Sequence, residues 1–542
     1  MAKRLEGDFD YIVVGAGTAG CILARRLSDS GRRSVLVLEA GGTDRRFWVR
    51  VPIGYGRTYN DPRVNWMYET APIEGLGGRS SYWPRGKVIG GSGSINAMVY
   101  VRGQPHDFDD WRAVGNVGWG WDDVLPYFKK TEDYNLGADA FHGSGGPQHV
   151  TDLTRLAHPL CSTFIETAAM LGFPHCADFN AGAAEGVGVF QINTRSGRRS
   201  STANALLRPA LRRKTVELRT KAHVTQVLFD GRRAAGVRYQ RNGAKHDVMA
   251  RREVILSGGS INSPQLLQLS GVGDAALLQR HAITPIIDLP AVGKNLQDHL
   301  AISAIYKSTV PTLNDDLRPW TGKVKAGLHY LFNRGGPLGL SVNQGGGFVR
   351  SDPAQSRINM QLYFSPVSYT QTPLSERKLL NPDPFSGFLL SFNACRPTSR
   401  GQIEIASGDP FAQPVIQPNY LATQHDVDEA IAGYRLLQKI AQTGPLASII
   451  HDTVVPHLPD ERDETLLADF RARADTVYHP TSSCMMGADP RASVVDARLR
   501  VHGIDGLRVI DASIFPTITS GNTNAPTVMV AEKGADMVIG DN

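Results

Sequence analysis

The stretch that decides the fold runs from residue 9 to residue 20 and reads Phe-Asp-Tyr-Ile-Val-Val-Gly-Ala-Gly-Thr-Ala-Gly. Its first half is a short apolar run, typical of a strand buried on both faces. Its second half matches the Gly-x-Gly-x-x-Gly pattern, and residues 21–27 then place apolar side chains at helical spacing up to Gly31. A second apolar run, residues 34–38, ends at Glu39. The pattern predicts a strand–helix–strand unit that binds a dinucleotide.

Each part of this unit has a physical reason. Gly15 permits the tight turn, Gly17 lets a pyrophosphate approach the backbone, and Gly20 lets helix and strand pack closely. The helix N-terminus directs unpaired N–H groups and a partial positive charge toward the phosphates. Glu39, 19 residues after Gly20, is expected to accept hydrogen bonds from the ribose hydroxyls. The unit alone does not choose between FAD and NAD.

The composition is that of a globular protein. A chain of 542 residues is long for one core, so two domains or one elaborated domain are expected. The net charge of +6 is small for this length and spread along the chain, so nucleic-acid binding is not predicted. No apolar run approaches the roughly 18–20 residues that span a bilayer, which leaves peripheral membrane association open.

The cysteines and the N-terminus indicate the cytoplasm. Cysteines stand at 21, 161, 176, 395 and 484, without metal-ligand or disulfide-framework spacing. Reduced thiols are therefore expected, and no metal site is predicted. Residues 1–8 lack the apolar core of a signal peptide. The sequence carries no signal for an oligomeric state.

A second glycine- and serine-rich segment, residues 85–103, reads Arg-Gly-Lys-Val-Ile-Gly-Gly-Ser-Gly-Ser-Ile-Asn-Ala-Met-Val-Tyr-Val-Arg-Gly. Such a loop can bring many backbone N–H groups and hydroxyls against an extended cofactor. The segment resembles the first signature of the glucose–methanol–choline (GMC) oxidoreductase family, and residues 259–273 resemble the second. Residues 292–299, 478–480, 507–513 and 521–527 continue the resemblance in the family's order. It spans residues 9–536 and is nearest to the bacterial choline-dehydrogenase-like and sorbose-dehydrogenase-like branch.

The resemblance implies FAD as the cofactor and a mixed α/β fold. The fold combines a Rossmann-type FAD-binding domain, which includes an antiparallel meander, with a smaller sheet-and-helix substrate domain. The residues implied to contact FAD are Gly15, Gly17, Thr18, Ala19, Gly20, Glu39, Ala40, Gly91, Ser92, Asn96, Ala97, Met98, Val99, Val224, Asp511, Asn522 and Thr523. Some relatives attach FAD covalently through a histidine where this chain has Ile95, so non-covalent FAD is expected. Gly93 stands where many relatives have serine.

Further along the chain the pattern predicts more strands. Residues 216–220, 222–230, 234–240 and 245–251 predict an antiparallel group, and residues 253–257 and 507–510 predict buried strands of the nucleotide sheet. A helical pattern at 426–442 predicts core packing. We expect a discontinuous FAD-binding domain at residues 1–155, 205–300 and 475–542, and a substrate-binding domain at 156–204 and 301–474.

Oxidising an alcohol means removing the hydroxyl proton and moving a hydride to flavin N5, so the protein must supply a base and orientation. Of the 15 histidines, His479 falls at the position of the family's catalytic histidine, and a histidine titrates near neutral pH. The resemblance makes Asn524 its partner, an amide that can hydrogen-bond the alkoxide but cannot take its proton. His299 is expected to be structural. Val477 and Tyr478 are expected to line the flavin face.

The expected substrate is an uncharged alcohol, preferably a primary one, which would be oxidised to an aldehyde; a secondary alcohol would give a ketone. In choline-oxidising relatives an acidic residue precedes a glycine-rich segment that ends in Phe. Residues 343–348 read Asn-Gln-Gly-Gly-Gly-Phe, so Gln344 replaces the acid and favours an uncharged ligand. The electron acceptor stays open between oxygen and a quinone-type carrier. A dehydrogenase is preferred over an oxidase that releases hydrogen peroxide.

Two other interpretations remain. The first is a non-redox enzyme with the same fold. The segment Cys395-Arg396-Pro397 resembles one found in fatty-acid photodecarboxylases of this family, and hydroxynitrile lyases also share the fold. The retained His479 and Asn524 favour alcohol oxidation over these non-redox activities. The second is a catalytically idle flavoprotein that serves as a scaffold, which reduction of its flavin by an alcohol would exclude.

Overall fold

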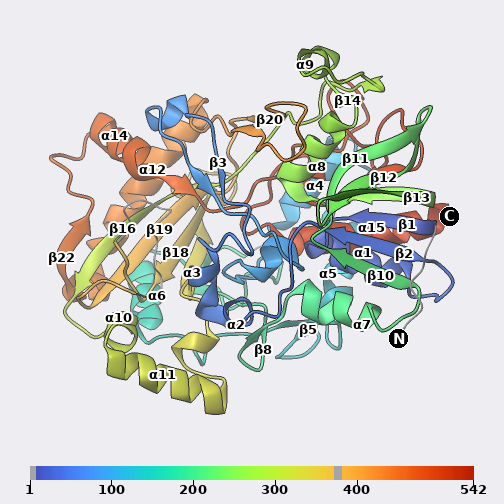
Figure 1. Ribbon diagram of the computed structural model, residues 1–542. Coiled ribbons are helices and arrows are strands. Elements are labelled where there is room, and N and C mark those ends of the chain that lie inside the picture. The colour runs from blue at the N-terminus through green and yellow to red at the C-terminus, as the bar shows by residue number, and fades with distance from the viewer. Residues whose placement is uncertain (1–7, 183, 371–380) are drawn as a thin grey trace.

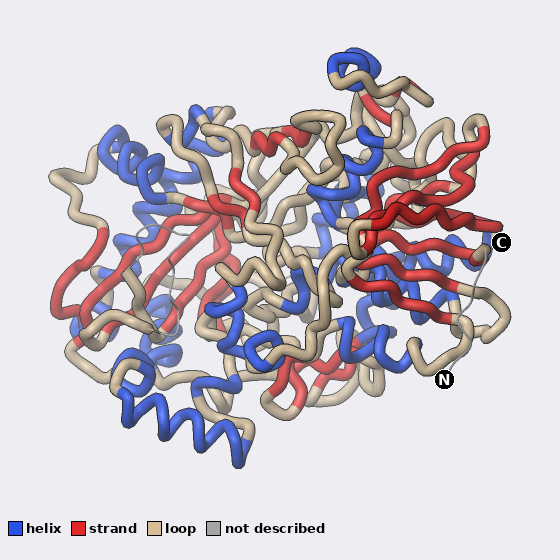
Figure 2. Tube along the Cα trace, in the orientation of Figure 1, coloured by secondary structure: helices blue, strands red, loops and turns tan. Residues whose placement is uncertain are grey.

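The computed structural model describes residues 8–182, 184–370 and 381–542. Two seven-stranded sheets, one on each side of the molecule, organise these residues (Figure 1). Figure 2 shows mostly loops between the two groups of strands. No helix within the described ranges has the length and apolarity to cross a membrane. Residues 1–7, which carry most of the signal-peptide expectation, lie outside the described residues.

The first sheet contains the predicted dinucleotide unit. Five parallel strands stand in the order β10 (Val216–Thr220), β2 (Val35–Glu39), β1 (Phe9–Val14), β13 (Ala244–Leu256) and β24 (Leu507–Val509). Helix α1 (Thr18–Leu27) connects β1 to β2, and β2 is buried throughout, as the apolar runs predict. The C-terminal helix α15 (Asn524–Asp541) packs beside α1.

Two expectations for the strands after residue 200 are wrong in detail. Strand β10 was expected in an antiparallel group, but it pairs in parallel with β2, because it takes the open edge of the sheet before the chain reverses at Lys221. Residues 253–256 are the end of β13 rather than a separate strand. The first half of β13 pairs antiparallel with β12 (Arg233–Arg241), which pairs with β11 (His223–Asp230). Burial rises along β13 where it leaves this meander and enters the parallel sheet.

The second sheet is antiparallel. Its order is β22 (Ile450–Val455), β16 (Leu300–Ser308), β19 (Gly387–Ala394), β18 (Met360–Ser365), β17 (Gly345–Val349) and β7 (Gly186–Val189), and β23 (Asp475–Thr476) also pairs with β16. Helices α6 (Leu160–Met170), α12 (Gln424–Ala441), α13 (Gly444–Ile449) and α14 (Asp463–Arg473) share its apolar core. Helix α12 confirms the helical pattern predicted at 426–442.

Two chain segments meet between the sheets. His299 immediately precedes β16, and β23 immediately precedes the segment 477–479. Because β16 and β23 pair antiparallel, His299 and His479 come together although 180 residues separate them. A bridge between Gln297 and Thr481 extends the pairing. The fold thus fixes the position of His479 through backbone pairing.

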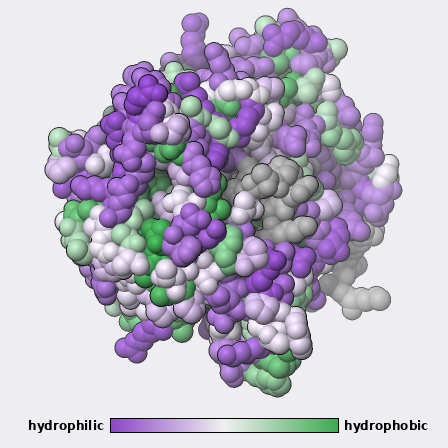
Figure 3. All heavy atoms as spheres, turned by 90° about the vertical axis from the view of Figure 1, so that its left-hand side faces the viewer, coloured by the Kyte–Doolittle hydropathy of each residue, from purple (hydrophilic) through white to green (hydrophobic). Residues whose placement is uncertain are grey.

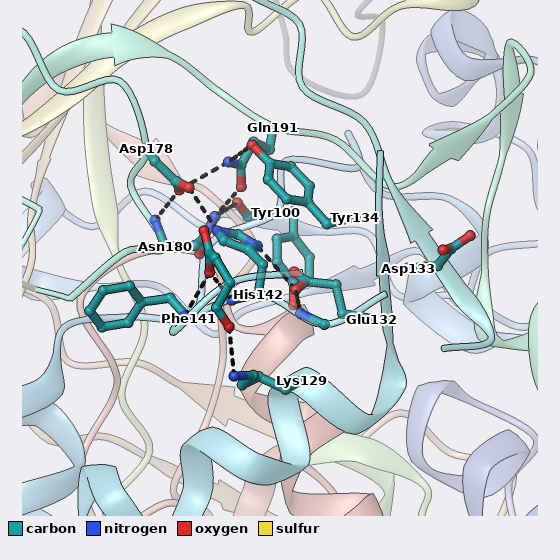
Figure 4. Close-up of polar contacts among 12 residues, drawn as sticks. Tyr100, Lys129, Glu132, Asp133, Tyr134, Phe141, His142, Asp178, Asn180 and Gln191 are labelled. Atoms are coloured by element: carbon teal, nitrogen blue, oxygen red, sulfur yellow. Dashed lines mark hydrogen bonds and ion pairs between the residues drawn. The ribbon is translucent and has the colours of Figure 1, made fainter. Parts of the chain in front are cut away.

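A buried charge cluster ties together three loops (Figure 4). The ring of His142 lies between Glu132 Oε2, 3.0 Å from Nδ1, and Asp178 Oδ2, 2.7 Å from Nε2. Glu132 also accepts a hydrogen bond from Arg102, and the His142 ring stacks on Tyr134. Burial alone would lower the pKa of His142, but hydrogen bonds to Asp178 and Glu132 outweigh it and raise that pKa to about 9. Protonated His142 and Arg102 therefore balance the buried carboxylate of Glu132 and the partly buried carboxylate of Asp178.

We predict that His142→Gln lowers the stability of the fold by about 3 kcal/mol, because it removes the buried cation between Glu132 and Asp178 and leaves Glu132 with Arg102 alone. In the unsubstituted protein this stabilisation is complete below the ordinary histidine pKa of about 6.5 and is lost as pH rises through about 9. Thermal unfolding between these pH values should show that decline, and the variant should lack it. His149→Gln is the matched control, because His149 bonds Asp133 at a partly exposed site and should contribute less than about 1 kcal/mol. Equal losses in both variants would contradict the assignment.

Candidate active site

A cavity of about 1050 Å³ lies between the two sheets. The first sheet contributes residues at the carboxyl ends of β1, β2 and β13, and the second contributes side chains of β16, β18, β19 and β22. Carboxyl ends of parallel strands are where this class of fold binds its ligands. Every predicted site residue except Gly20 and Gln344 lines this cavity. The structure therefore brings segments from residue 15 to residue 524 to one place.

Two glycine loops touch at the nucleotide end of the cavity. A Cβ added to Gly91 would lie 2.8 Å from Gly17 Cα, and Gly91 has a φ of +54°. A Cβ on Gly17 itself would meet only ordinary van der Waals contacts, and Gly17 lines the cavity. Gly20 lies beneath the loop, where a Cβ would come within 1.9 Å of Gly15 O. The cavity therefore presents bare backbone of the kind that a pyrophosphate needs.

Glu39 holds the first of these loops. Its carboxylate accepts hydrogen bonds from Ala16 N at 2.9 Å and Gly41 N at 2.8 Å. Burial raises the pKa of Glu39 to about 7, although these two hydrogen bonds act to lower it. Glu39 still lines the cavity, and each carboxylate oxygen has a further lone pair for a ribose hydroxyl.

Two helix N-termini meet at the same cavity. Thr18 begins α1 and Asn524 begins α15, and Asn524 Nδ2 donates to Thr18 Oγ1 at 3.0 Å. A Cβ on Gly93 would lie 2.7 Å from the same Thr18 oxygen, so this contact leaves little room for the serine of many relatives. Two partial positive charges therefore face one anion-sized space, which fits a bound dinucleotide.

His479 stands at the other end of the site. Its Nδ1 lies 3.0 Å from Nδ1 of His299, and its Nε2 lies 3.0 Å from Asn522 Nδ2. His299 Nε2 lies 2.9 Å from the carbonyl oxygen of Cys395. Gln361 on β18 donates to Asn522 Oδ1 at 3.3 Å, which turns the amide nitrogen of Asn522 toward His479. These residues form one chain of hydrogen bonds.

The chain fixes which nitrogen of His479 carries the proton. A carbonyl only accepts, so His299 Nε2 must donate to Cys395. Burial lowers the pKa of His299 to about 4, so its ring is neutral and its Nδ1 can only accept. His479 Nδ1–H therefore donates to His299, and His479 Nε2 is the unprotonated nitrogen, whose lone pair accepts from the amide of Asn522.

Burial also lowers the pKa of His479 well below its ordinary value, helped by the nearby His299 and by the positive charge of Arg85. The backbone of the residue is held by Asp298, whose Oδ1 accepts from His479 N at 2.7 Å. Tyr478 has a φ of +70°, uncommon for a non-glycine residue, and its hydroxyl lies 2.7 Å from that of Tyr59. This region is held rigidly around a neutral imidazole.

One predicted pairing is wrong. The sequence placed Asn524 beside His479, but the structure places Asn522 there and turns Asn524 to Thr18. The reason is that α15 begins at Asn524, so its side chain lies at the helix end, while Asn522 lies in the preceding loop. His299, expected to be structural, contacts His479 directly.

Gln344 is also misplaced by the sequence. It is buried, its Oε1 accepts from His158 N at 2.7 Å, and it does not line the cavity. The adjacent Asn343 lines the cavity instead, since neighbouring residues of an extended segment point to opposite sides.

A site that joins a dinucleotide cradle to a neutral, oriented histidine is that of a nucleotide-dependent oxidoreductase. Models of the GMC oxidoreductase N- and C-terminal domains match residues 9–301 and 397–531. The chain is 41% identical over 535 residues to an alcohol dehydrogenase [acceptor] of Pseudomonas putida, covering 98% of this chain and 96% of that protein. It is also 41% identical over 550 residues to a mitochondrial choline dehydrogenase of Mus musculus, covering 100% and 91%. The crystal structure of pyridoxine 4-oxidase from Mesorbium loti superposes with a TM-score of 0.88 at 30% identity, covering 98% and 99%.

The chain therefore belongs to the GMC oxidoreductase family, and it is an oxidoreductase with the FAD-binding fold of that family.

We predict that Gly91→Ala weakens FAD binding at least about tenfold, or about 1.4 kcal/mol, because the new methyl would push the two glycine loops apart. Release of flavin, followed by the recovery of its fluorescence on dilution, measures this. Gly42→Ala is the control, since its Cβ would meet nothing within 4 Å. Full FAD occupancy in Gly91→Ala would show that the contact between the loops does not shape the site.

Proposed function

We propose that this protein is an FAD-dependent alcohol dehydrogenase that oxidises a primary, uncharged alcohol, with His479 as the general base. The observation that carries the proposal is the unprotonated Nε2 of His479, which lies in the cavity and accepts from the amide of Asn522. A base must be unprotonated and within reach of the proton that it removes. His479 meets the first condition at neutral pH because its pKa is lowered.

The residues present fit FAD. The loops at Gly17 and Gly91 and the two helix N-termini would hold the pyrophosphate, and Glu39 would hold the ribose. Ile95 lines the cavity and has no atom that bonds a flavin, which supports non-covalent binding. When bound, FAD supplies the hydride acceptor. We assign this binding to residues 1–155, 205–300 and 475–542, and substrate binding to 156–204 and 301–474.

The protein's own groups then handle the proton. An alcohol hydroxyl that replaced the hydrogen bond between Asn522 and His479 would donate to His479 Nε2 and accept from Asn522 Nδ2. Proton transfer to Nε2 leaves the alkoxide oxygen facing the Asn522 amide, which stabilises its charge. His479 then carries both protons, and the neutral Nδ1 of His299 accepts the hydrogen bond from His479 Nδ1–H.

The walls of the cavity support an uncharged substrate. The lining residues from β16, β18, β19 and β22 are all uncharged: Ala301, Ser303, Ile305, Tyr363, Leu389, Ser391 and Val455. Asp475 on β23 also lines the cavity, but it accepts from Ser81 and lies near the charge of Arg79. Aromatic rings alone hold a cation by only about 0.5–2 kcal/mol.

The competing non-redox activity finds less support. Cys395 is buried behind His299 and is not among the lining residues of the cavity, and its backbone carbonyl rather than its thiol serves the site. The acceptor proposed is a quinone-type carrier, with oxygen as the alternative. The five cysteines are free and buried, which supports a reducing compartment, and we propose the cytoplasm.

We predict that His479→Ala slows anaerobic flavin reduction by an alcohol about 10²–10⁴-fold while FAD still binds. Asn522→Ala should cost on the order of 10²–10³-fold. In the unsubstituted enzyme the rate should stay level through neutral pH and fall only below the ordinary histidine pKa, because the pKa of His479 is lowered. His457→Ala, at an exposed histidine, is the control. A normal rate in His479→Ala would place the base elsewhere.

We also predict that choline is a poorer substrate than 1-butanol or benzyl alcohol. A buried quaternary ammonium needs a carboxylate partner. The lining residues of β16, β18, β19 and β22 are uncharged, and Asp475 on β23 is already hydrogen-bonded by Ser81. Steady-state kcat/KM values for choline and the neutral alcohols, measured with one electron acceptor, decide this. The same measurement in air with peroxide detection shows whether oxygen serves as the acceptor. The highest kcat/KM with choline would refute this account of the cavity.

A further inference from the structure

Helix α11 (Trp320–Asn333) turns large apolar side chains to solvent. The exposed fractions are 76% for Trp320, 50% for Val324, 51% for Leu328, 59% for Leu331 and 76% for Phe332. At about 100° per residue these five occupy one sector of about 120°. Figure 1 places the helix at the lower rim of the molecule.

The opposite side of α11 is already packed. Ala326 and Tyr330 are buried in a small core with Val51, Ile53 and Tyr55. Tyr330 also donates to Gly197 O at 2.8 Å. The exposed sector is therefore a second apolar face of a helix whose first face is docked.

This concentration is unusual for the protein. Among the described residues, sixteen large apolar side chains are exposed, and five of them lie on this one helix of 14 residues. The others are scattered, as on most soluble surfaces. Figure 3 is turned about the vertical axis, so α11 lies at the same height in it as in Figure 1. At that height, at the bottom of the face shown, hydrophobic and hydrophilic residues lie side by side.

The charged residues within α11 and next to its two ends are all positive. Lys325 borders it on one side and Lys323 lies beyond its other edge, while Arg318 and Arg334 stand near the two helix ends. No aspartate or glutamate occurs from residue 318 to residue 334. Long lysine side chains can lay their stems along an apolar surface and keep the charge in the polar layer.

We propose that α11 docks this protein on an anionic lipid bilayer, with the apolar sector inserted at the level of the headgroups. A helix with Trp, Phe and Leu on one face and lysines at its borders has the composition of interfacial membrane helices. A second copy of the chain fits less well, because pairing through α11 would bring two basic edges together. The charge selects a negatively charged surface.

The docking would place the membrane one layer of side chains from the active-site cavity. Tyr55 packs in the core beneath α11 and also lines the cavity. A lipophilic alcohol or quinone that leaves the bilayer would thus have a short path to the cavity. This consequence rests on the proposed function. The docking of α11 on a bilayer does not depend on the proposed function.

The test is co-sedimentation of the FAD-loaded protein with vesicles of equal parts phosphatidylcholine and phosphatidylglycerol, and with phosphatidylcholine alone. We expect binding to the anionic vesicles that weakens with salt. Val324→Asp combined with Leu328→Asp should lower that binding at least about tenfold, because two inserted side chains are lost. Lys323→Glu with Lys325→Glu should reduce binding to anionic vesicles selectively.

The matched control is Val117→Asp with Leu136→Asp, two exposed apolar residues in loops outside α11, which should bind as the unsubstituted protein does. Oxidation of a water-soluble alcohol without vesicles reports on the fold and the proposed function separately. Failure of the unsubstituted protein to sediment with anionic vesicles would overturn the proposal. Normal vesicle binding by the Val324→Asp/Leu328→Asp variant would also overturn it. A third contradicting result would be that the unsubstituted protein is a dimer, that the variant is a monomer, and that neither protein binds vesicles.

Discussion

The hydrogen bond between His299 and His479 is the constraint on which the site depends. It exists because β16 and β23 pair antiparallel, which brings the residue before one strand against the segment after the other. Cys395 sets the tautomer of His299, and His299 sets the tautomer of His479. The second sheet thus determines the chemistry of a residue that faces the nucleotide half of the molecule.

The half of the molecule built on the parallel sheet has its own constraint, which is the close approach of two backbone loops to each other. Contact between the loops at Gly17 and Gly91, and between the first residues of α1 and α15, leaves N–H groups and helix ends turned to the cavity. Any side chain larger than hydrogen at Gly91 would separate the loops. The two halves therefore shape one cavity by different means, bare backbone in one and buried imidazoles in the other.

Much of the fold could be predicted from the sequence, because its strongest signals are local. The strand–helix–strand unit at 9–39 combines apolar runs, glycine spacing and an acidic residue, and α12 follows from helical periodicity. The partner of β10 could not be predicted, since nothing within residues 216–220 specifies which edge of a sheet they join. The length of β13 was missed because one strand serves two sheets.

The site was predicted as a set of positions but not as a set of contacts. Motifs located His479 and the segment 521–527, yet whether Asn522 or Asn524 faces His479 depends on where α15 begins. The role of His299 depends on strand pairing over 180 residues, which no local pattern encodes. Gln344 was misplaced by one residue, which in an extended chain reverses the direction of the side chain.

The account is tested most directly at His299, through the pH dependence of anaerobic flavin reduction. In His299→Leu, His479 Nδ1–H loses its acceptor, so His299 no longer holds Nε2 as the unprotonated nitrogen. We expect reduction to slow by about tenfold or more, as for other misoriented general bases, with FAD still bound. His299→Gln keeps an acceptor for His479 and a donor for Cys395, and should restore most of the rate. Equal rates and equal pH profiles in His299→Leu and the unsubstituted enzyme would contradict the claim that His299 sets the base.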